Sequence, residues 1–90
     1  MFNKYAIEFL GTLLIVYIVL LTKGNPLAIG AAVAIAIYLG GKISGGHFNP
    51  AISVALVRNG TLPKADLIIY ILAQIVAGLA AIELYNRVQL

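Results

Sequence analysis

The sequence contains no cysteine and only one histidine, His47. Without cysteine there is neither a disulfide framework nor a thiolate metal site, and a lone histidine has no second imidazole with which to hold a metal. Asp and Glu together number three, so acids are scarce as well. Ser44 stands close to His47, but nothing supplies the orienting third group of a nucleophile–base set. We therefore expect neither an enzyme nor a metal or cofactor site.

Charge is also scarce: 10% of the 90 residues are charged, whereas 62% are hydrophobic and the mean hydropathy is +1.04. Soluble domains are nearer to about 45–50% apolar, so the composition indicates a membrane protein. The net charge of +3 does not indicate nucleic-acid binding, because the basic residues stand singly between apolar runs instead of forming a patch. These six residues are Lys4, Lys23, Lys42, Arg58, Lys64 and Arg87.

Three apolar segments are long enough to cross a bilayer. We expect helices over about 5–22, 26–42 and 65–84, because a hydrocarbon core of about 30 Å requires about 20 helical residues. Two of them carry small residues every fourth position, a register that favours close packing of membrane helices over a mere abundance of alanine. The stripes are Ala28, Ala32, Ala36 and Gly40, and Ala73, Ala77 and Ala81.

A glycine-rich turn and a short apolar run separate the second and third segments. Asn49 is a favourable helix N-cap and Pro50 suits the first helical position, so a helix is predicted to begin here. From Pro50 and Ala51 to Val57 it reaches only about 12 Å, too short to span. Residues 43–57 therefore read as a re-entrant loop and half-helix. Because irregular backbone is tolerated in a membrane only inside protein or beside water, the turn indicates a pore or pocket.

The stretch Ser44-Gly45-Gly46-His47-Phe48-Asn49-Pro50-Ala51 resembles the first signature of the aquaporin and aquaglyceroporin family, also called the major intrinsic proteins. Glu8-Phe9-Leu10-Gly11-Thr12 and Tyr70-Ile71-Leu72-Ala73-Gln74 extend the resemblance, in the order that the first half of such proteins has. The resemblance implies an all-α membrane protein with three transmembrane helices and one re-entrant half-helix. Residues 1–90 would form one half of an aquaporin-like inverted-repeat fold.

The resemblance also implies a role for the loop in solute passage. The Asn49 carboxamide oxygen can cap the helix while its NH₂ group faces the lumen and donates to a passing molecule. Gly45, Gly46 and His47 would present carbonyl acceptors, although the glycines equally suit a tight turn at positive φ. We expect the His47 side chain to stabilise the turn through a hydrogen bond. The half-helix dipole at Asn49 disfavours cations and protons.

Glu8 and Gln74 are polar residues within the spanning segments. A carboxylate such as that of Glu8 is energetically costly inside a membrane unless it is paired or faces a polar interior. One reading places Glu8 at the interface, against headgroups or Lys4. The resemblance implies another, in which Glu8 is a buried brace that accepts hydrogen bonds from the amides of the loop. Gln74 is expected to make a similar polar contact between helices.

Two departures from the family pattern affect the function. Ile29 lies twenty residues before Asn49, where water-selective members place an aromatic residue in their constriction, so the choice between water and glycerol-like solutes stays open. The sequence also has no second Asn-Pro-Ala and no constriction arginine. A single copy does not enclose a pore between repeats, so we expect a homo-oligomer, a complementary half, or a fragment of a longer channel.

The expected function is passive conduction of water or small uncharged solutes, such as glycerol, through the lipid bilayer once a second half is present. Two alternatives stay open. The chain could be a non-conducting interaction subunit or truncated fragment that packs on full-length channels, or a proton-coupled transporter that uses Glu8 and His47.

The basic residues also predict a topology. Four of them fall on one side of the membrane and two on the other, and the positive-inside bias places the more basic side in the cytoplasm. The N-terminus would then be cytoplasmic and Leu90 outside. The first group is Lys4, Lys42, Arg58 and Lys64, and the second is Lys23 and Arg87.

Overall fold

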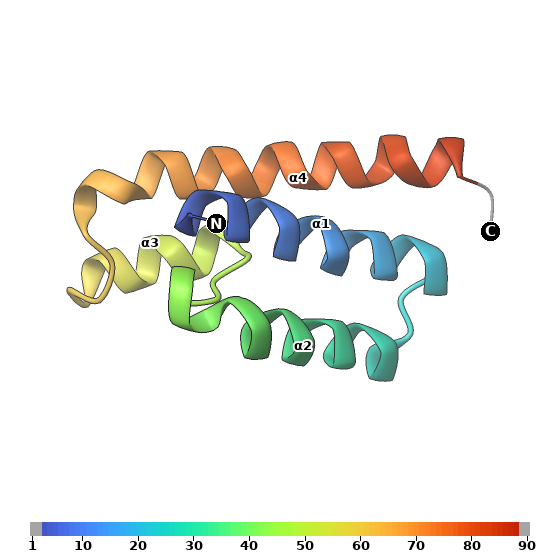
Figure 1. Cartoon of the computed structure of the whole chain (residues 1–90), viewed down its shortest axis with the longest axis horizontal. Coiled ribbons are helices and arrows are strands. Elements are labelled where there is room, and N and C mark those ends of the chain that lie inside the picture. The colour runs from blue at the N-terminus through green and yellow to red at the C-terminus, as the bar shows by residue number, and fades with distance from the viewer. Residues whose placement is uncertain (1–2, 89–90) are drawn as a thin grey trace.

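The computed structural model describes residues 3–88, and within this range all regular secondary structure is helical. Three long helices lie side by side along the 40 Å axis of the molecule, and a short helix lies beside the first part of α4 (Figure 1). The elements are α1 (Lys4–Thr22), α2 (Pro26–Ser44), α3 (Pro50–Arg58), the 3₁₀ helix η1 (Lys64–Asp66) and α4 (Leu67–Arg87).

Three helical stretches are long and apolar enough to cross a membrane: Lys4–Thr22, Pro26–Ser44 and Lys64–Arg87. The remaining α-helix, α3, has nine residues and is therefore about 14 Å long at 1.5 Å per residue. The structure therefore confirms the expected fold class, an all-α membrane protein consistent with half of an aquaporin-like fold.

The first three helices begin in the same way, with an asparagine cap. Asn3 Oδ1 accepts from the amide of Ala6, and Asn25 Oδ1 accepts from the amides of Leu27 and Ala28. Asn49 repeats the arrangement at the start of α3, and Pro50 there occupies the first helical turn. The start of α3 is thus an ordinary capped helix terminus, specified locally by an Asn-Pro pair.

Two helices run past the ends expected from hydrophobicity. α2 continues from 42 to Ser44 because Gly45, at φ 92°, supplies a left-handed cap whose amide donates to the carbonyl of Gly41 at 2.8 Å. α4 begins after the turn of η1 and continues beyond 84 to Arg87. Its last turn is polar, with an exposed Glu83–Arg87 pair at 3.4 Å, so helical structure persists where apolar character has ended.

The interior is unusually polar, and its apolar part is made largely of small residues. Among the described residues, seven buried side chains are polar or charged and seven are hydrophobic, including four alanines. Large side chains point outward instead: Tyr38 is 86% exposed and Leu39 71%. Small residues inside and large apolar ones outside suit a lipid environment, in which close backbone approach replaces the hydrophobic drive between helices.

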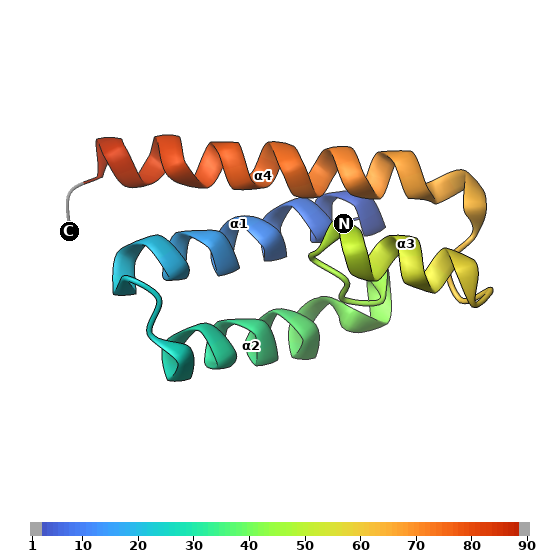
Figure 2. The ribbon, with the colours of Figure 1, turned by 180° about the vertical axis from the view of Figure 1, so that it is seen from behind.

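α1 lies between α2 and α4 and packs against both (Figures 1 and 2). Gly40 of α2 comes so close to α1 that a Cβ atom built there would lie 2.5 Å from Cγ2 of Ile7. Ala32, Ala36, Ala77 and Ala81 of the two predicted stripes are buried, whereas Ala28 and Ala73 are half-buried. The stripes therefore face the interior of the bundle over most of their length.

A polar cluster joins the first turn of α1 to the start of α4. Asp66 accepts hydrogen bonds from Lys4 Nζ at 2.6 Å and from the Tyr5 hydroxyl at 2.7 Å. The Tyr5 ring in turn meets Tyr70 edge to face, with 5.9 Å between centroids. These contacts hold the start of α1 against η1 and the start of α4.

Candidate functional site

α3 begins within the length of the bundle and runs outward to the end at which α4 starts (Figure 1). At its N-terminus, Asn49 has extended backbone and its Oδ1 accepts from the amide of Ala51 at 2.8 Å. Asn49 is exposed in the described chain, and no hydrogen bond found among residues 3–88 uses its NH₂ group. Helix capping thus occupies the oxygen and leaves the donor end of the amide free.

The loop before Asn49 has an unusual backbone. Gly45 and Gly46 have φ values of 92° and 67°, and Phe48 has a φ of 55°. Glycine adopts such angles without strain, whereas a bulky residue does so only where its surroundings enforce it. The sequence analysis attached positive φ to the glycines alone, and the structure adds Phe48, the residue that immediately precedes Asn49.

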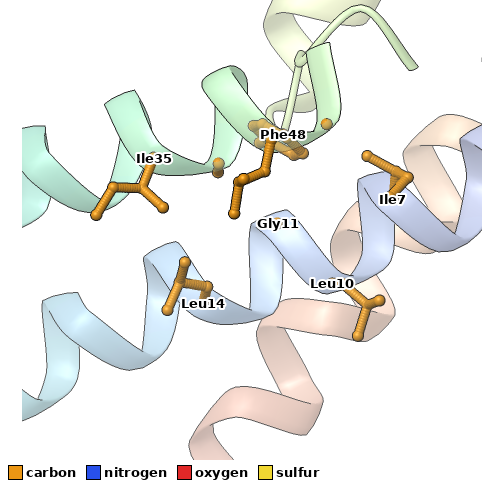
Figure 3. A pocket seen from close by; sticks show the side chains of 9 residues that line it. Ile7, Leu10, Gly11, Leu14, Ile35 and Phe48 are labelled. Carbon is orange, nitrogen blue, oxygen red and sulfur yellow. The ribbon is translucent and has the colours of Figure 1, made fainter. Parts of the chain in front are cut away.

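Packing enforces this conformation of Phe48. Its ring lies over Gly11 of α1, in the space between α1 and α2 (Figure 3). A Cβ atom built on Gly11 would lie 2.1 Å from Cε1 of that ring. Only glycine, which has no Cβ atom, avoids this clash. Phe48 is 8% exposed, so its side chain anchors the loop in the bundle.

The Glu8 carboxylate holds the same loop through four hydrogen bonds. Oε1 accepts from the amide of Phe48 at 2.7 Å and from Gln74 Nε2 at 2.9 Å. Oε2 accepts from the Ser44 hydroxyl at 2.8 Å and from the amide of His47 at 3.0 Å. Glu8 is fully buried, and four donors compensate for the loss of water around its charge.

The interfacial reading of Glu8 does not match this geometry. Lys4, the partner considered for it, bonds to Asp66 instead. The structure places Glu8 and Gln74 together in the interior, in contact with the loop that carries Asn49.

His47 is a buried support inside the turn. Its Nδ1 lies 2.8 Å from the hydroxyl of Ser53, which also accepts from Gln74 Nε2 at 2.9 Å. Its ring lies 5.2 Å from that of Tyr70, whose hydroxyl donates to the carbonyl of Ser44 at 2.7 Å. Both ends of the turn are therefore tied to α4.

The carbonyls of Gly45, Gly46 and His47 turn away from these internal partners. The amides that follow them point inward: Gly46 N–H to the Ser44 hydroxyl at 3.1 Å, and His47 and Phe48 N–H to Glu8. Because a trans peptide holds its N–H and C=O on opposite sides, inward amides leave these carbonyls free to accept from elsewhere.

Two hollows adjoin the loop. The polar hollow, of about 380 Å³, lies between α1, α4 and the start of α3; most of its lining is apolar, and it is named for the three polar residues that it includes, Thr12, Asn49 and Gln74. The apolar hollow, of about 190 Å³, lies between α1 and α2 around Phe48 and has no polar side chain in its lining (Figure 3). Ile29 lines neither of them and is half-buried in the second turn of α2.

From the sequence alone, Ser53 and Tyr70 were not assigned to this network, and Thr12, which lines the hollow beside it, was given no role. Thr12 follows Glu8 by four residues, Ser53 follows Asn49 by four, and Tyr70 precedes Gln74 by four. Residues four apart share one face of a helix. Each missed residue could have been found as the helical neighbour of a residue that the motifs had already identified.

Comparison with known proteins identifies the family. Residues 1–89 match the model of the family described as major intrinsic protein. Glycerol uptake facilitator protein-like 6 of Lactiplantibacillus plantarum is 46% identical over an alignment of 87 residues that covers 88% of this chain and 40% of the relative. Aquaporin Z of Brucella melitensis is 40% identical over 95 residues, covering 90% of this chain and 42% of the relative.

Human aquaporin-10 is 50% identical over an alignment of 64 residues that covers 67% of this chain and 21% of that protein. No solved structure matches the chain. It spans about two fifths of the length of the bacterial relatives. The matched family consists of integral membrane channels, not enzymes. With its buried Glu8, its Asn49-capped half-helix and three spanning helices, the chain belongs to the major intrinsic protein family.

Proposed function

We propose that the chain forms part of a passive channel for water or small uncharged solutes such as glycerol. The observation that carries the proposal is the divided use of the Asn49 amide, whose oxygen caps α3 while its NH₂ group remains exposed beside the polar hollow. The names of the relatives, glycerol uptake facilitator and aquaporin, support the same solutes. Asn49 would donate to the solute, and the outward carbonyls of Gly45, Gly46 and His47 would accept from it.

The electrostatics favour an uncharged solute. The N-terminus of α3 presents the equivalent of about half a positive charge, which disfavours cations at Asn49. No charged side chain lines the polar hollow. Glu8 lies close by, but four donors already surround its carboxylate.

We further propose that a second half closes the pore, either as a complementary chain or as a second copy in the opposite orientation. Asn49 is exposed in the described chain, and channels of this repeat type place their sites between two halves. Ile29 would then contribute an apolar side chain to the constriction.

Stopped-flow swelling of proteoliposomes tests this function. The chain is reconstituted alone and together with the part of the Lactiplantibacillus relative that it does not cover. We expect rapid water or glycerol flux from the assembled pair. Assembled protein with the permeability of empty vesicles would instead support a non-conducting subunit.

The Asn49→Ser variant tests the donor. Serine still caps a helix but lacks the NH₂ group, so permeability should fall by about two- to tenfold, the equivalent of one net hydrogen bond. The matched control is Asn59→Ser, at the other end of α3, where the exposed asparagine side chain bonds, among residues 3–88, only to Thr61. Equal permeability of the two variants would contradict the role of Asn49.

We also propose a cytoplasmic N-terminus. The start of α1 and the ends of α2 and α3 lie at the same end of the bundle as the start of α4 (Figure 2), which supports grouping their four basic residues on one side. Leu90, expected on the outer side of the membrane, is not among the described residues.

Because the sequence has no cysteine, single cysteines can report this topology. An impermeant maleimide should label Val88→Cys in intact cells and Thr61→Cys only after permeabilisation; both positions are exposed. The reverse pattern, or labelling of both in intact cells, would refute the proposed orientation.

A further inference from the structure

The apolar hollow between α1 and α2 reaches the surface of the bundle. Its volume is about 190 Å³, and the ring of Phe48 forms part of its wall (Figure 3). Leu14 of α1 and Ile35 of α2 lie on either side of it, and both side chains are exposed, as are those of Leu10 and Leu39. Because exposed apolar side chains of two membrane-spanning helices form its rim, this hollow is open to the bilayer.

The apolar hollow lies on a different side of α1 from the polar hollow. Leu10 and Leu14 line the apolar hollow, whereas Thr12 and Val16 line the polar one. Residues two apart are about 200° apart around an α-helix, because 3.6 residues make one turn. A second half that closes a pore over Asn49 would therefore cover the polar hollow and leave the apolar hollow on the outer side of the bundle.

An empty apolar hollow is unfavourable in a membrane. Side chains that line a void lose dispersion contacts on one side, and protein interiors are packed with few voids. Lipid acyl chains surround a membrane-spanning helix and are as apolar as leucine side chains, and no polar side chain lines this hollow. An acyl chain is therefore the group that fits it.

A lysine lies on the same face of α2 as the rim of the apolar hollow. Ile35, Leu39 and Lys42 follow one another at intervals of four and three residues, so they share one side of the helix. Lys42 belongs to the last turn of α2 and is exposed, and no hydrogen bond or ion pair found in the described chain uses its ammonium group. Lys4, at the same end of the bundle, bonds instead to Asp66 at 2.6 Å. The charge of Lys42 is therefore free to attract an anion beside the hollow.

We propose that an anionic phospholipid occupies this site, with an acyl chain in the apolar hollow against Phe48 and its phosphate at Lys42. Lysine binds phosphate as a point charge, and its long side chain reaches the headgroup level while its stem covers apolar surface. Basic sites between membrane helices bind anionic headgroups. The acyl chain completes the packing around the Phe48 ring, which anchors the loop before Asn49. This role does not depend on whether the channel conducts.

Quenching of tryptophan fluorescence by brominated phospholipids tests the proposal, because the sequence has no tryptophan. The variants Leu14→Trp and Leu39→Trp place a reporter on the α1 wall and on the α2 wall of the apolar hollow. Each is reconstituted in vesicles that contain brominated phosphatidylglycerol, which is anionic, or brominated phosphatidylcholine, which carries no net charge. We expect about a fivefold preference for phosphatidylglycerol at both reporters, the contribution of one lysine, and its loss when Lys42→Gln is added.

Two controls separate this site from general attraction to the membrane. Lys64→Gln removes another exposed lysine at the same end of the bundle, away from the hollow, and should keep the preference at both reporters. Leu72→Trp places a reporter on an exposed position of α4 that lines neither hollow, and Lys42→Gln should not change its quenching.

Three results would overturn the proposal. Equal quenching by the two lipids at Leu14→Trp and Leu39→Trp would show that no anionic lipid is selected. A preference at Leu39→Trp alone would place the lipid on α2 outside the apolar hollow. Absence of quenching at both reporters would show that protein, such as a second copy of the chain, covers the hollow.

Discussion

Replacing Glu8 with glutamine should abolish conduction by the assembled channel and strongly destabilise the fold. The carboxylate receives four donors, two on each oxygen. A glutamine has one acceptor oxygen, so its NH₂ group would face at least one fixed N–H donor, whichever way the amide is turned. Each buried donor left unpaired costs about 1–3 kcal/mol, so the free energy of unfolding should fall by roughly 1–6 kcal/mol.

Swelling rates of proteoliposomes measure the loss of conduction, and unfolding in denaturant measures the loss of stability. Glu83→Gln is the matched control because Glu83 is exposed and pairs with Arg87 one helical turn away. Such surface pairs contribute about 0.3–0.5 kcal/mol, so the control should behave like the wild type. An E8Q channel with normal flux and stability would show that the carboxylate does not hold the loop.

Gly11→Ala should also stop conduction, through packing rather than through charge. The added methyl group would lie 2.1 Å from the ring of Phe48, a residue that is buried and already held at positive φ. Because Phe48 immediately precedes Asn49, we expect the displaced ring to shift the backbone of the loop and with it the Asn49 donor. We expect a stability loss of about 1–3 kcal/mol, as is usual for overpacked sites, and a larger loss of flux.

Gly30→Ala provides the control for this substitution. It is also a helical glycine, in α2, but nothing lies within 4 Å of a Cβ atom built on it. The Gly30→Ala variant should keep the flux of the wild type. Its free energy of unfolding should rise by up to about 1 kcal/mol because alanine has a higher helix propensity than glycine. The double variant Gly11→Ala/Phe48→Leu should recover part of the lost flux by making room for the methyl group. If Gly11→Ala does not reduce flux, the proposed role of Phe48 as the anchor of the loop is contradicted.

The elements of the fold could be predicted from the sequence because each depends on local features. Apolar length specifies α1, α2 and α4, and the Asn49-Pro50 pair specifies the start of α3. The register of Ala32, Ala36 and Gly40 pointed to a packed face, and these residues are buried. The end of α2 was placed two residues early because the left-handed cap at Gly45 has no counterpart in hydrophobicity.

The contacts within the site required the tertiary structure. A sequence does not show that Ser53 lies between His47 and Gln74, because the three belong to a loop and two different helices. The positive φ of Phe48 arises from its packing on Gly11 in a helix 37 positions earlier in the chain. Thr12 was visible only as a helical neighbour of Glu8, and its place beside the polar hollow becomes apparent only when the helices are packed.

The partners of the loop come from opposite ends of the chain: Glu8 from α1, and Tyr70 and Gln74 from α4. During synthesis, the loop leaves the ribosome after α1 but before α4. Residues 45–49 therefore lack part of their hydrogen-bonding partners until α4 has packed against α1. Folding of the loop into its final conformation thus depends on a segment that is synthesised after it.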